Sequence, residues 1–297
     1  MIQPEGIKPN DLIYIAAPAK AIEAETVLAA KRFLESWGYR VKISANCLGR
    51  FNYFSGTDEE RLADFQLGID DPEVKAVLCA RGGYGCVRIV NHLDWTRFKE
   101  NPKWIIGFSD VTVFHQKLHR LGYQSIHSIM PLGFLEGTED AKNTLKGAMS
   151  ASAYELSGPK SEYNCFGAAI GGLIGGNLTI IHSLLGTPLS YSFENKILFI
   201  EDVGEHVYKI DRMLQSLKLA GVFNKISGLV VGAFTEIEDT DVPFGKSIHE
   251  LILDHIKDQQ IPVAFDFPIG HINDNRAIVV GKQGQLTVDE KGSTLLI

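Results

Sequence analysis

The sequence predicts an α/β protein with a Rossmann-like parallel-sheet N-terminal domain and a smaller α/β C-terminal domain. The chain has 297 residues, enough for two domains at roughly 150 residues each. In its first half, continuous apolar segments alternate with amphipathic ones, as expected for a parallel sheet covered by helices on both faces. A glycine-rich segment then precedes a second alternating region. We therefore expect a Rossmann-like domain at 1–150, a linker at 151–176 and a C-terminal domain at 177–297.

The N-terminal domain should begin with the buried strand DLIYIAAPA, which ends in a loop of small residues at Ala16–Ala19. A helix at 22–37 should end at Gly38, a common helix stop. The helix TDEERLADFQLGID has a capping box, because Thr57 stands three residues before Glu60. The other expected elements are the strands YRVKIS, KAVLCA and KWIIGF, a helix candidate CVRIVNHL and the helix SDVTVFHQKLHRLG.

The C-terminal domain should alternate in the same way. We expect a helix at 177–185, and the strand KILFIEDVG ends in acidic residues. The last residues, GQLTVDEKGSTLLI, are typical of a hairpin with its turn at Asp289–Gly292. Between these lie the helices YKIDRMLQSLKLAG and KSIHELILDHIKD, the strand ISGLVVGAF and the strand or extended run PVAFDFPIGH.

Composition excludes several classes of function. Lys and Arg number 29 against 36 Asp and Glu, with no basic run, so we expect no nucleic-acid partner. No apolar stretch approaches the roughly 18 residues of a membrane span, and no signal peptide is recognisable, so we expect a cytoplasmic protein that does not bind membranes. The four cysteines, which form no C-x-x-C pair, should be free buried thiols: Cys47, Cys79, Cys86 and Cys165.

The segment WIIGFSDVTVF carries the strongest chemical signal. An apolar strand stops at Gly107 and a helix begins after Ser109, which would hold the serine hydroxyl at the edge of the sheet beside unpaired helix N–H groups. Such groups stabilise an oxyanion. The pattern resembles G-x-S-x-G, but Val111 stands at the fifth position. Ser109 could instead be only an N-cap.

A serine nucleophile needs a base and an acid that orients it. His271 is the candidate base because it follows a strand-like run in a loop. Glu201 or Asp202, at the end of the strand KILFI, is the candidate acid. An ordinary loop histidine and a turn-capping acid are the simpler alternatives.

Three further patterns are less specific. The loop RGGYG could supply an oxyanion donor or bind phosphate, but it matches no nucleotide-binding motif. His115 and His119 have metal-ligand spacing, yet Gln116 stands where a zincin has glutamate. The acidic run at 236–241 lacks the glycine and final glutamate of a calcium loop. We therefore expect no metal and no organic cofactor.

Six motifs in this order resemble the LD-carboxypeptidases of the serine-peptidase S66 type. They are IAAPA, ARGGYG at Ala80–Gly85, GFSD at Gly107–Asp110, GGNL at Gly175–Leu178, EDVGE at Glu201–Glu205 and GH at Gly270–His271. The resemblance covers most of the chain. It implies a triad of Ser109, Glu201 and His271 in a cleft between the domains, with an oxyanion hole at Asp110 and Gly83.

The resemblance also implies a reaction. The enzyme would remove the terminal D-alanine from a murein tetrapeptide, cutting an L-to-D bond during cell-wall recycling. Such an exopeptidase needs a cation for the substrate carboxylate, and Arg81 and Arg88 lie near the proposed site in the sequence. We expect Arg81, Tyr84 and Asn177 to contact the substrate, and a homodimer as the assembly.

Three alternatives remain open from the sequence. A microcin-immunity type S66 peptidase would cleave a peptidyl or aminoacyl nucleotide. A general α/β-hydrolase esterase would have glycine at position 111 and an H-G-G loop, and this chain has neither. A non-catalytic protein could bind a small ligand between two domains.

Overall fold

The computed structural model describes all 297 residues and separates into two compact units. Unit 1 comprises Met1–Ala153 and Asn273–Val279, and unit 2 comprises Tyr154–Ile272 and Val280–Ile297. Each unit contains one sheet and its own helices, so the predicted α/β class is confirmed. Every helix is too short or too polar to cross a membrane.

Unit 1 is built on a six-stranded sheet in the order β11-β5-β4-β3-β1-β2. The neighbours among β1 to β5 pair in parallel, as the buried apolar strands predict. The strands are β1 (Leu12–Ala16), β2 (Arg40–Ile43), β3 (Val74–Cys79), β4 (Trp104–Gly107), β5 (Ser125–His127) and β11 (Ile278–Val280).

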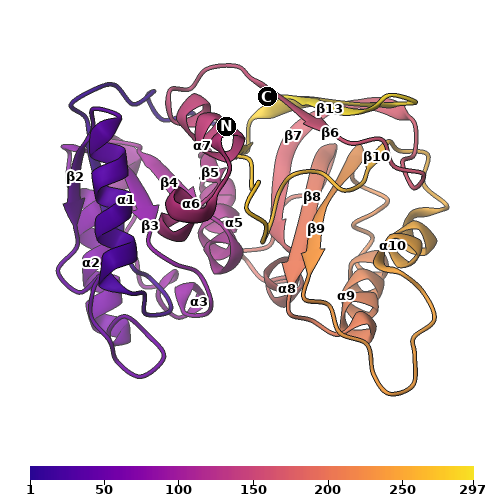
Figure 1. Cartoon of the computed structure of the whole chain (residues 1–297), viewed down its shortest axis with the longest axis horizontal. Coiled ribbons are helices and arrows are strands. Elements are labelled where there is room, and N and C mark those ends of the chain that lie inside the picture. The colour runs from indigo at the N-terminus through magenta and orange to yellow at the C-terminus, as the bar shows by residue number, and fades with distance from the viewer. The chain divides into compact units, whose positions relative to one another are not determined.

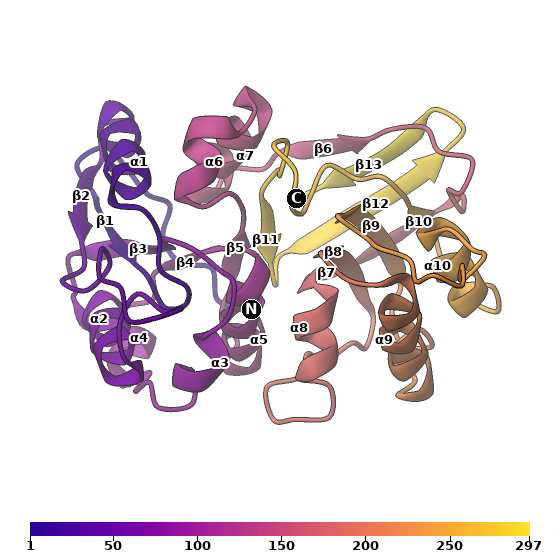
Figure 2. The same cartoon turned by 60° about the horizontal axis from the view of Figure 1, so that its bottom comes forward.

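Helices cover both faces of this sheet (Figure 2). Helix α1 (Ala24–Ser36) packs against β2 and α6 (Pro131–Glu136), while α2 (Asp58–Asp70) packs against β1 and β3. The capping box of Thr57 and Glu60 is present at the start of α2, as predicted. The remaining helices are α3 (Cys86–Ile89), α4 (Thr96–Glu100), the 3₁₀ turn Ser109–Val111, α5 (Thr112–Leu121) and α7 (Glu139–Met149).

Unit 2 has a seven-stranded mixed sheet in the order β10-β9-β8-β7-β12-β13-β6. The first four strands in this order run parallel, and the pairs from β7 to β6 are antiparallel. The predicted C-terminal hairpin is confirmed, with Asp289 opposite Gly292. The strands are β6 (Glu155–Gly158), β7 (Gly167–Asn177), β8 (Lys196–Val203), β9 (Gly228–Thr235), β10 (Val263–Ala264), β12 (Gln283–Asp289) and β13 (Gly292–Leu296).

Three helices accompany the parallel part of the unit 2 sheet (Figure 1). They are α8 (Leu178–Ser183), α9 (Val207–Leu219) and α10 (Ile248–Ile256). Helix α9 packs between the other two. Helix α8 also contacts β7 and β8, which places its first residues near the end of the acidic strand.

The structure differs from the prediction at 151–176, which we expected to be a linker. This segment contains β6 and β7, two strands of the unit 2 sheet. Its glycines allow the close approach of neighbouring backbone rather than flexibility: a Cβ atom placed on Gly175 would lie 2.0 Å from the carbonyl oxygen of Phe199. Glycine-rich composition therefore marks a tightly packed strand here.

A second difference concerns the late return of the chain to unit 1. Residues 273–279, expected in the C-terminal domain, belong to unit 1, where Arg276 pairs with Asp140 at 2.8 Å. The amide of Ala277 donates to the Thr144 hydroxyl at 3.0 Å. The chain crosses between the units directly after Ile272, one residue beyond His271.

We predict that Gly175→Ala destabilises the protein far more than Gly186→Ala. Both glycines have positive φ, of 152° and 78°, but only Gly175 has backbone where the new methyl group would lie. Gly186→Ala should cost about 1–2 kcal/mol from the left-handed backbone alone. Gly175→Ala should exceed that cost by at least about 2 kcal/mol because β8 must move. Denaturant unfolding measures both, and equal losses would contradict this reading of the β7 glycines.

Candidate functional site

Three loops of unit 1 meet at the carboxyl edge of its sheet, following β1, β3 and β4. The amide of Lys20, after β1, donates to the carbonyl of Gly82, after β3, at 3.3 Å. A Cβ atom placed on Gly82 would lie 3.2 Å from Oγ of Ser109, after β4. RGGYG and Ser109 lie together because adjacent parallel strands end at one edge of a sheet.

Ser109 has a left-handed backbone, with φ of 63°. For a residue with a Cβ atom this conformation costs about 1–2 kcal/mol. The serine is half-buried and is the first residue of the 3₁₀ turn before α5, whereas the N-cap residues of the turn and of α5 are Phe108 and Val111. The N-cap alternative therefore does not describe it. A strained serine in a sharp strand-to-helix turn is the arrangement that holds out a nucleophile.

Val111 occupies the fifth position of this turn because Gly107 has no side chain. A Cβ atom placed on Gly107 would lie 2.9 Å from Cγ2 of Val111 and 3.2 Å from Cβ of Cys79. The valine thus fills the space over the first glycine of the motif. This contact explains how the chain makes the turn without a second glycine.

Asp110 ties the serine turn to the glycine loop. Its carboxylate is buried and accepts a hydrogen bond of 2.8 Å from the amide of Cys86, the first residue of α3. Burial raises the pKa of Asp110, while hydrogen bonds from Cys86 and Gly85 and the charge of Arg61 act in the opposite direction. Arg61, also buried, donates to the carbonyl of Gly85 at 3.2 Å and to that of Pro18. Arg61 is the fourth residue of α2 and directly follows Glu60 of the capping box, and nothing in the sequence marks it as a neighbour of the serine turn.

Arg81 and Tyr84, which were predicted to contact substrate, are exposed residues of the glycine loop RGGYG. Tyr84 has 46% of its surface exposed. Arg81 is exposed and donates to the carbonyl of Ala21 at 3.2 Å. Arg88 instead forms an ion pair of 2.6 Å with Asp58. Arg81 therefore has no carboxylate partner, whereas Arg88 is paired with one.

In unit 2, Glu201 and His271 form a buried pair. Oε2 of Glu201 lies 2.7 Å from Nδ1 of His271, and the two side chains are 0% and 21% exposed. The pairing of β8 with β9 shifts register between Ile200 and Asp202, so Glu201 sits at an irregularity of the kind that redirects a side chain. Gly270 lets the loop approach, since a Cβ there would lie 2.8 Å from Cβ of Glu201.

The pair sets the protonation of the histidine. Burial lowers the pKa of His271, but the hydrogen bond and charge of Glu201, with smaller contributions from Asp202 and Glu236, outweigh it. The net effect is a pKa above the usual 6.5. The bond to Nδ1 also fixes which ring nitrogen faces the acid, as in catalytic histidine–carboxylate pairs.

Asp202, the other acid candidate, binds the start of α8. It accepts hydrogen bonds of 2.8 Å from the side chain of Asn177 and of 2.9 Å and 2.8 Å from the amide and hydroxyl of Thr179. Burial, followed by the charge of Glu201, raises the pKa of Asp202 to about 6. Asn177, predicted to contact substrate, is buried and caps α8 by accepting from the amide of Ile180 at 3.1 Å.

His115, half of the metal-spaced pair, has both ring nitrogens in hydrogen bonds within unit 1. Nδ1 lies 2.8 Å from Oγ of Ser125, and Nε2 lies 2.9 Å from the carbonyl of Gly107. Burial lowers the pKa of His115 to about 4, so the ring is neutral at pH 7. This neutral ring supports the carbonyl that precedes the serine turn.

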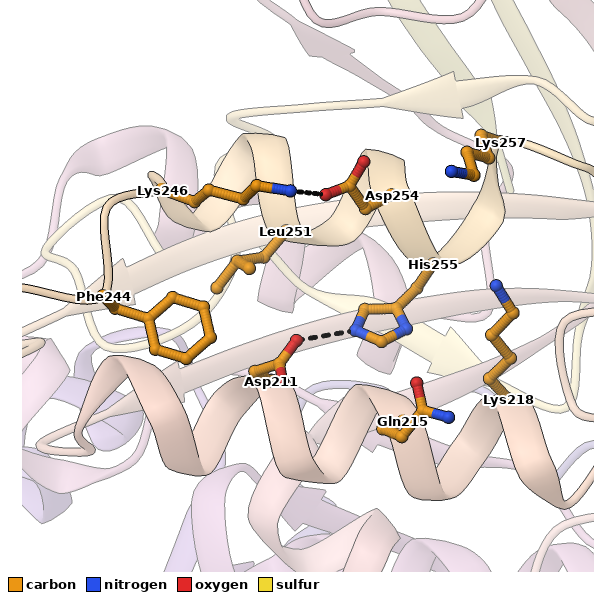
Figure 3. Close-up of a pocket in the computed structure, with 9 residues that line it drawn as sticks. All are labelled: Asp211, Gln215, Lys218, Phe244, Lys246, Leu251, Asp254, His255 and Lys257. Carbon is orange, nitrogen blue, oxygen red and sulfur yellow. Dashed lines mark hydrogen bonds and ion pairs between the residues drawn. The ribbon is translucent and has the colours of Figure 1, made fainter.

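A groove between α9, α10 and the loop that precedes α10 holds a second group of charges (Figure 3). Lys246 points toward Asp254, and His255 lies 2.9 Å from Asp211. The contact of His255 with Asp211 joins α10 to α9, whereas that of Lys246 with Asp254 joins α10 to the loop before it. The groove includes neither Glu201 nor His271.

A strained serine at a strand-to-helix turn, and an acid–histidine pair, are the parts of a serine hydrolase carried on two α/β units. Comparison with known proteins identifies the kind. The profile of the LD-carboxypeptidase N-terminal domain matches residues 13–128, and that of the LD-carboxypeptidase C-terminal domain matches 170–286. The chain belongs to this family, the S66 peptidases, and is a serine-type carboxypeptidase, as the sequence motifs predicted.

Individual carboxypeptidases of this family match nearly the whole chain. The murein tetrapeptide carboxypeptidase of Pseudomonas aeruginosa is 31% identical over 291 residues, which cover 92% of each chain. The crystal structure of muramoyltetrapeptide carboxypeptidase from Oxalobacter formigenes has a TM-score of 0.86 at 30% identity and covers 96% of this chain and 98% of that one. The microcin C7 self-immunity protein MccF shares the fold, with a TM-score of 0.89 at 20% identity, covering 100% and 98%.

We predict that Gly82→Ala impairs catalysis without unfolding the protein. The new methyl group would lie 3.0 Å from Cβ of Ser109 and 3.2 Å from the amide nitrogen of Asp110, so Ser109 must shift. A misplacement of about 1 Å can cost about 100-fold in rate. The measurement is kcat/KM for peptide hydrolysis beside the unfolding free energy. As a control, Gly122→Ala adds its methyl group in open space and should leave kcat/KM unchanged. Full activity in Gly82→Ala would contradict the proposed tight contact.

Proposed function

We propose that this enzyme removes the terminal D-alanine from murein tetrapeptides by a triad of Ser109, Glu201 and His271. The observation that carries the proposal is the buried bond between Glu201 and His271, a histidine oriented by an acid on the family's carboxyl-terminal domain. The strained turn at Ser109 supplies a matching nucleophile on the amino-terminal domain. Relatives named as murein tetrapeptide and muramoyltetrapeptide carboxypeptidases support the choice of substrate.

In this mechanism His271 accepts the proton of the Ser109 hydroxyl at Nε2, because Nδ1 faces Glu201. Ser109 Oγ attacks the carbonyl carbon of the residue before D-alanine, and a tetrahedral intermediate forms. His271 then gives its proton to the amine of the departing D-alanine. A water molecule, deprotonated by His271, releases the shortened peptide from Ser109. Glu201 stabilises the imidazolium while it carries the proton.

The negative oxygen of the intermediate needs two donors. We assign them to the backbone amides of Asp110 and Gly83. The Asp110 amide belongs to the 3₁₀ turn at Ser109, and Gly83 follows the glycine that contacts Ser109. Loss of one such donor costs about 10²- to 10³-fold in kcat. The proposal also includes a cytoplasmic location and a homodimer, which cell fractionation and light scattering measure.

The direct test offers the enzyme synthetic tetrapeptides that end in L-Lys-D-Ala, L-Lys-L-Ala or meso-diaminopimelate-D-Ala. We expect release of D-alanine from one or both of the peptides with a D-terminal residue and none from the L-terminal one. An aminoacyl sulfamoyl nucleotide tests the competing substrate class, which is what MccF holds in its solved complexes. Cleavage of a nucleotide conjugate alone would reject the murein proposal.

We predict that Ser109→Ala lowers kcat on the order of 10⁶-fold, as loss of a triad nucleophile does. The unfolding free energy should change by less than about 1 kcal/mol, because Ser109 is the N-cap residue of neither the 3₁₀ turn nor α5. Chromatographic detection of D-alanine measures the first quantity and denaturant unfolding the second. Turnover at the wild-type rate would remove Ser109 from the mechanism.

We predict that kcat/KM rises with pH through a pKa above 6.5, since His271 must be neutral to act as a base. In Glu201→Gln this inflection should move to lower pH, because burial of the imidazole remains while the charge that raised its pKa is gone. The rate plateau should fall by about 10⁴-fold. Glu236→Gln should shift the inflection less, because the charge of Glu236 has a smaller effect on the pKa of His271. An unmoved inflection in Glu201→Gln would separate the observed titration from His271.

A further inference from the structure

We propose that Lys20 binds the C-terminal carboxylate of the peptide substrate, with Tyr53 holding the lysine side chain in place. The inference rests on the proposed function, since only a carboxypeptidase needs a cation for that carboxylate beside its nucleophile. None of the sequence motifs contains Tyr53, and Lys20 directly follows the small-residue loop after β1.

Lys20 is anchored to the glycine loop by its backbone. Its amide donates to the carbonyl of Gly82 at 3.3 Å, and its side chain lies along Gly83. A Cβ atom placed on Gly83 would lie 2.9 Å from Cβ and 3.3 Å from Cδ of Lys20. The hydroxyl of Tyr53 lies 2.9 Å from the same point. Lys20 and Tyr53 thus border the residue that follows the contact with Ser109.

Lys20 borders the loop one residue beyond the contact with Ser109, which matches the one residue of substrate between the scissile carbonyl and the free carboxylate. In a carboxypeptidase the scissile carbonyl lies at the nucleophile and the free carboxylate lies one residue further along the substrate. One residue of chain spans roughly 3.3–3.6 Å. Gly82 faces Ser109 Oγ, and the stem of Lys20 begins beside the next residue, Gly83. The flexible four-carbon stem of a lysine can bring its ammonium group to a carboxylate there.

Charge pairing separates Lys20 from three arginines of unit 1 but not from Arg81, which donates only to the carbonyl of Ala21. Arg50 pairs with Glu23 at 2.5 Å, and both Arg61 and Arg88 pair with Asp58. The ammonium of Lys20 instead lies 5.0 Å from the ring centroid of Tyr53. A cation–π contact orients a cation without neutralising its charge. Lys20 therefore has no carboxylate partner, and its side chain lies along Gly83 with its ammonium group over the ring of Tyr53.

The test compares a tetrapeptide that the wild-type enzyme cleaves with the same peptide carrying a C-terminal amide. The readout is the ratio of kcat/KM for the acid to that for the amide. We expect the wild type to favour the acid, and Lys20→Met to lower this ratio about 10- to 100-fold, the range of a charge-assisted hydrogen bond. Methionine keeps the apolar stem along Gly83 and leaves the bond to Gly82 intact. Loss of folding or of the nucleophile would lower both rates and leave the ratio unchanged.

Lys146→Met is the matched control, because Lys146 lies over the ring of Trp37 at 5.5 Å in the same unit. It should keep the wild-type ratio. An unchanged ratio in Lys20→Met overturns the inference, as does loss of the preference in Arg81→Met with Lys20→Met unaffected, which would assign the carboxylate to Arg81. If the wild-type enzyme releases D-alanine from no tetrapeptide, the proposed function itself fails and the carboxylate subsite fails with it.

Discussion

The carboxylate of Asp110 is the contact on which the catalytic edge of unit 1 depends. Two loops leave the sheet after β3 and β4, and nothing in a parallel sheet fixes such loops against each other. Asp110 does so by accepting a hydrogen bond of 2.8 Å from the amide of Cys86, so the residue after Ser109 holds the end of the glycine loop. Arg61 adds a bond from α2 to the carbonyl of Gly85. The strained φ of Ser109 can persist because the next residue, Asp110, is fixed in this way.

In unit 2, two adjacent carboxylates, Glu201 and Asp202, lie near the end of one buried strand, β8. Two like charges at this spacing disfavour each other's ionisation. The chain separates their partners: Glu201 pairs with His271, while Asp202 accepts three hydrogen bonds from Asn177 and Thr179 at the start of α8. Asp202 also contributes, behind Glu201, to the raised pKa of His271. Asp202 thus stabilises the start of α8 through these hydrogen bonds and, after Glu201, helps to raise the pKa of His271.

Much of the fold could be predicted from the sequence because its signals are local. The parallel strands of unit 1 are continuous apolar runs, the start of α2 carries Thr57 and Glu60 at capping spacing, and the final hairpin has a turn sequence. The errors concern segments whose structure is set by distant neighbours. The glycines of β7 look like a linker until β8 lies against them, and β11 has only three residues to indicate which sheet it joins. PVAFDFPIGH, expected as a strand or extended run, contributes only the two residues of β10 to the sheet.

The candidate site divides in the same way. Ser109 and the glycine loop could be placed together from the sequence, since the ends of adjacent parallel strands must meet. Residue types alone left both Glu201 and Asp202 open as the acid, and only the family resemblance favoured Glu201. Their difference depends on a register shift in β8 that moves a side chain by one position. Lys20 had no signal at all: a lysine after a strand is ordinary, and only its packing along Gly83 and over Tyr53 distinguishes it. Residue types and spacing therefore pointed to the proposed reacting groups. The groups that position or recognise are defined by contacts between loops, which the sequence alone does not specify.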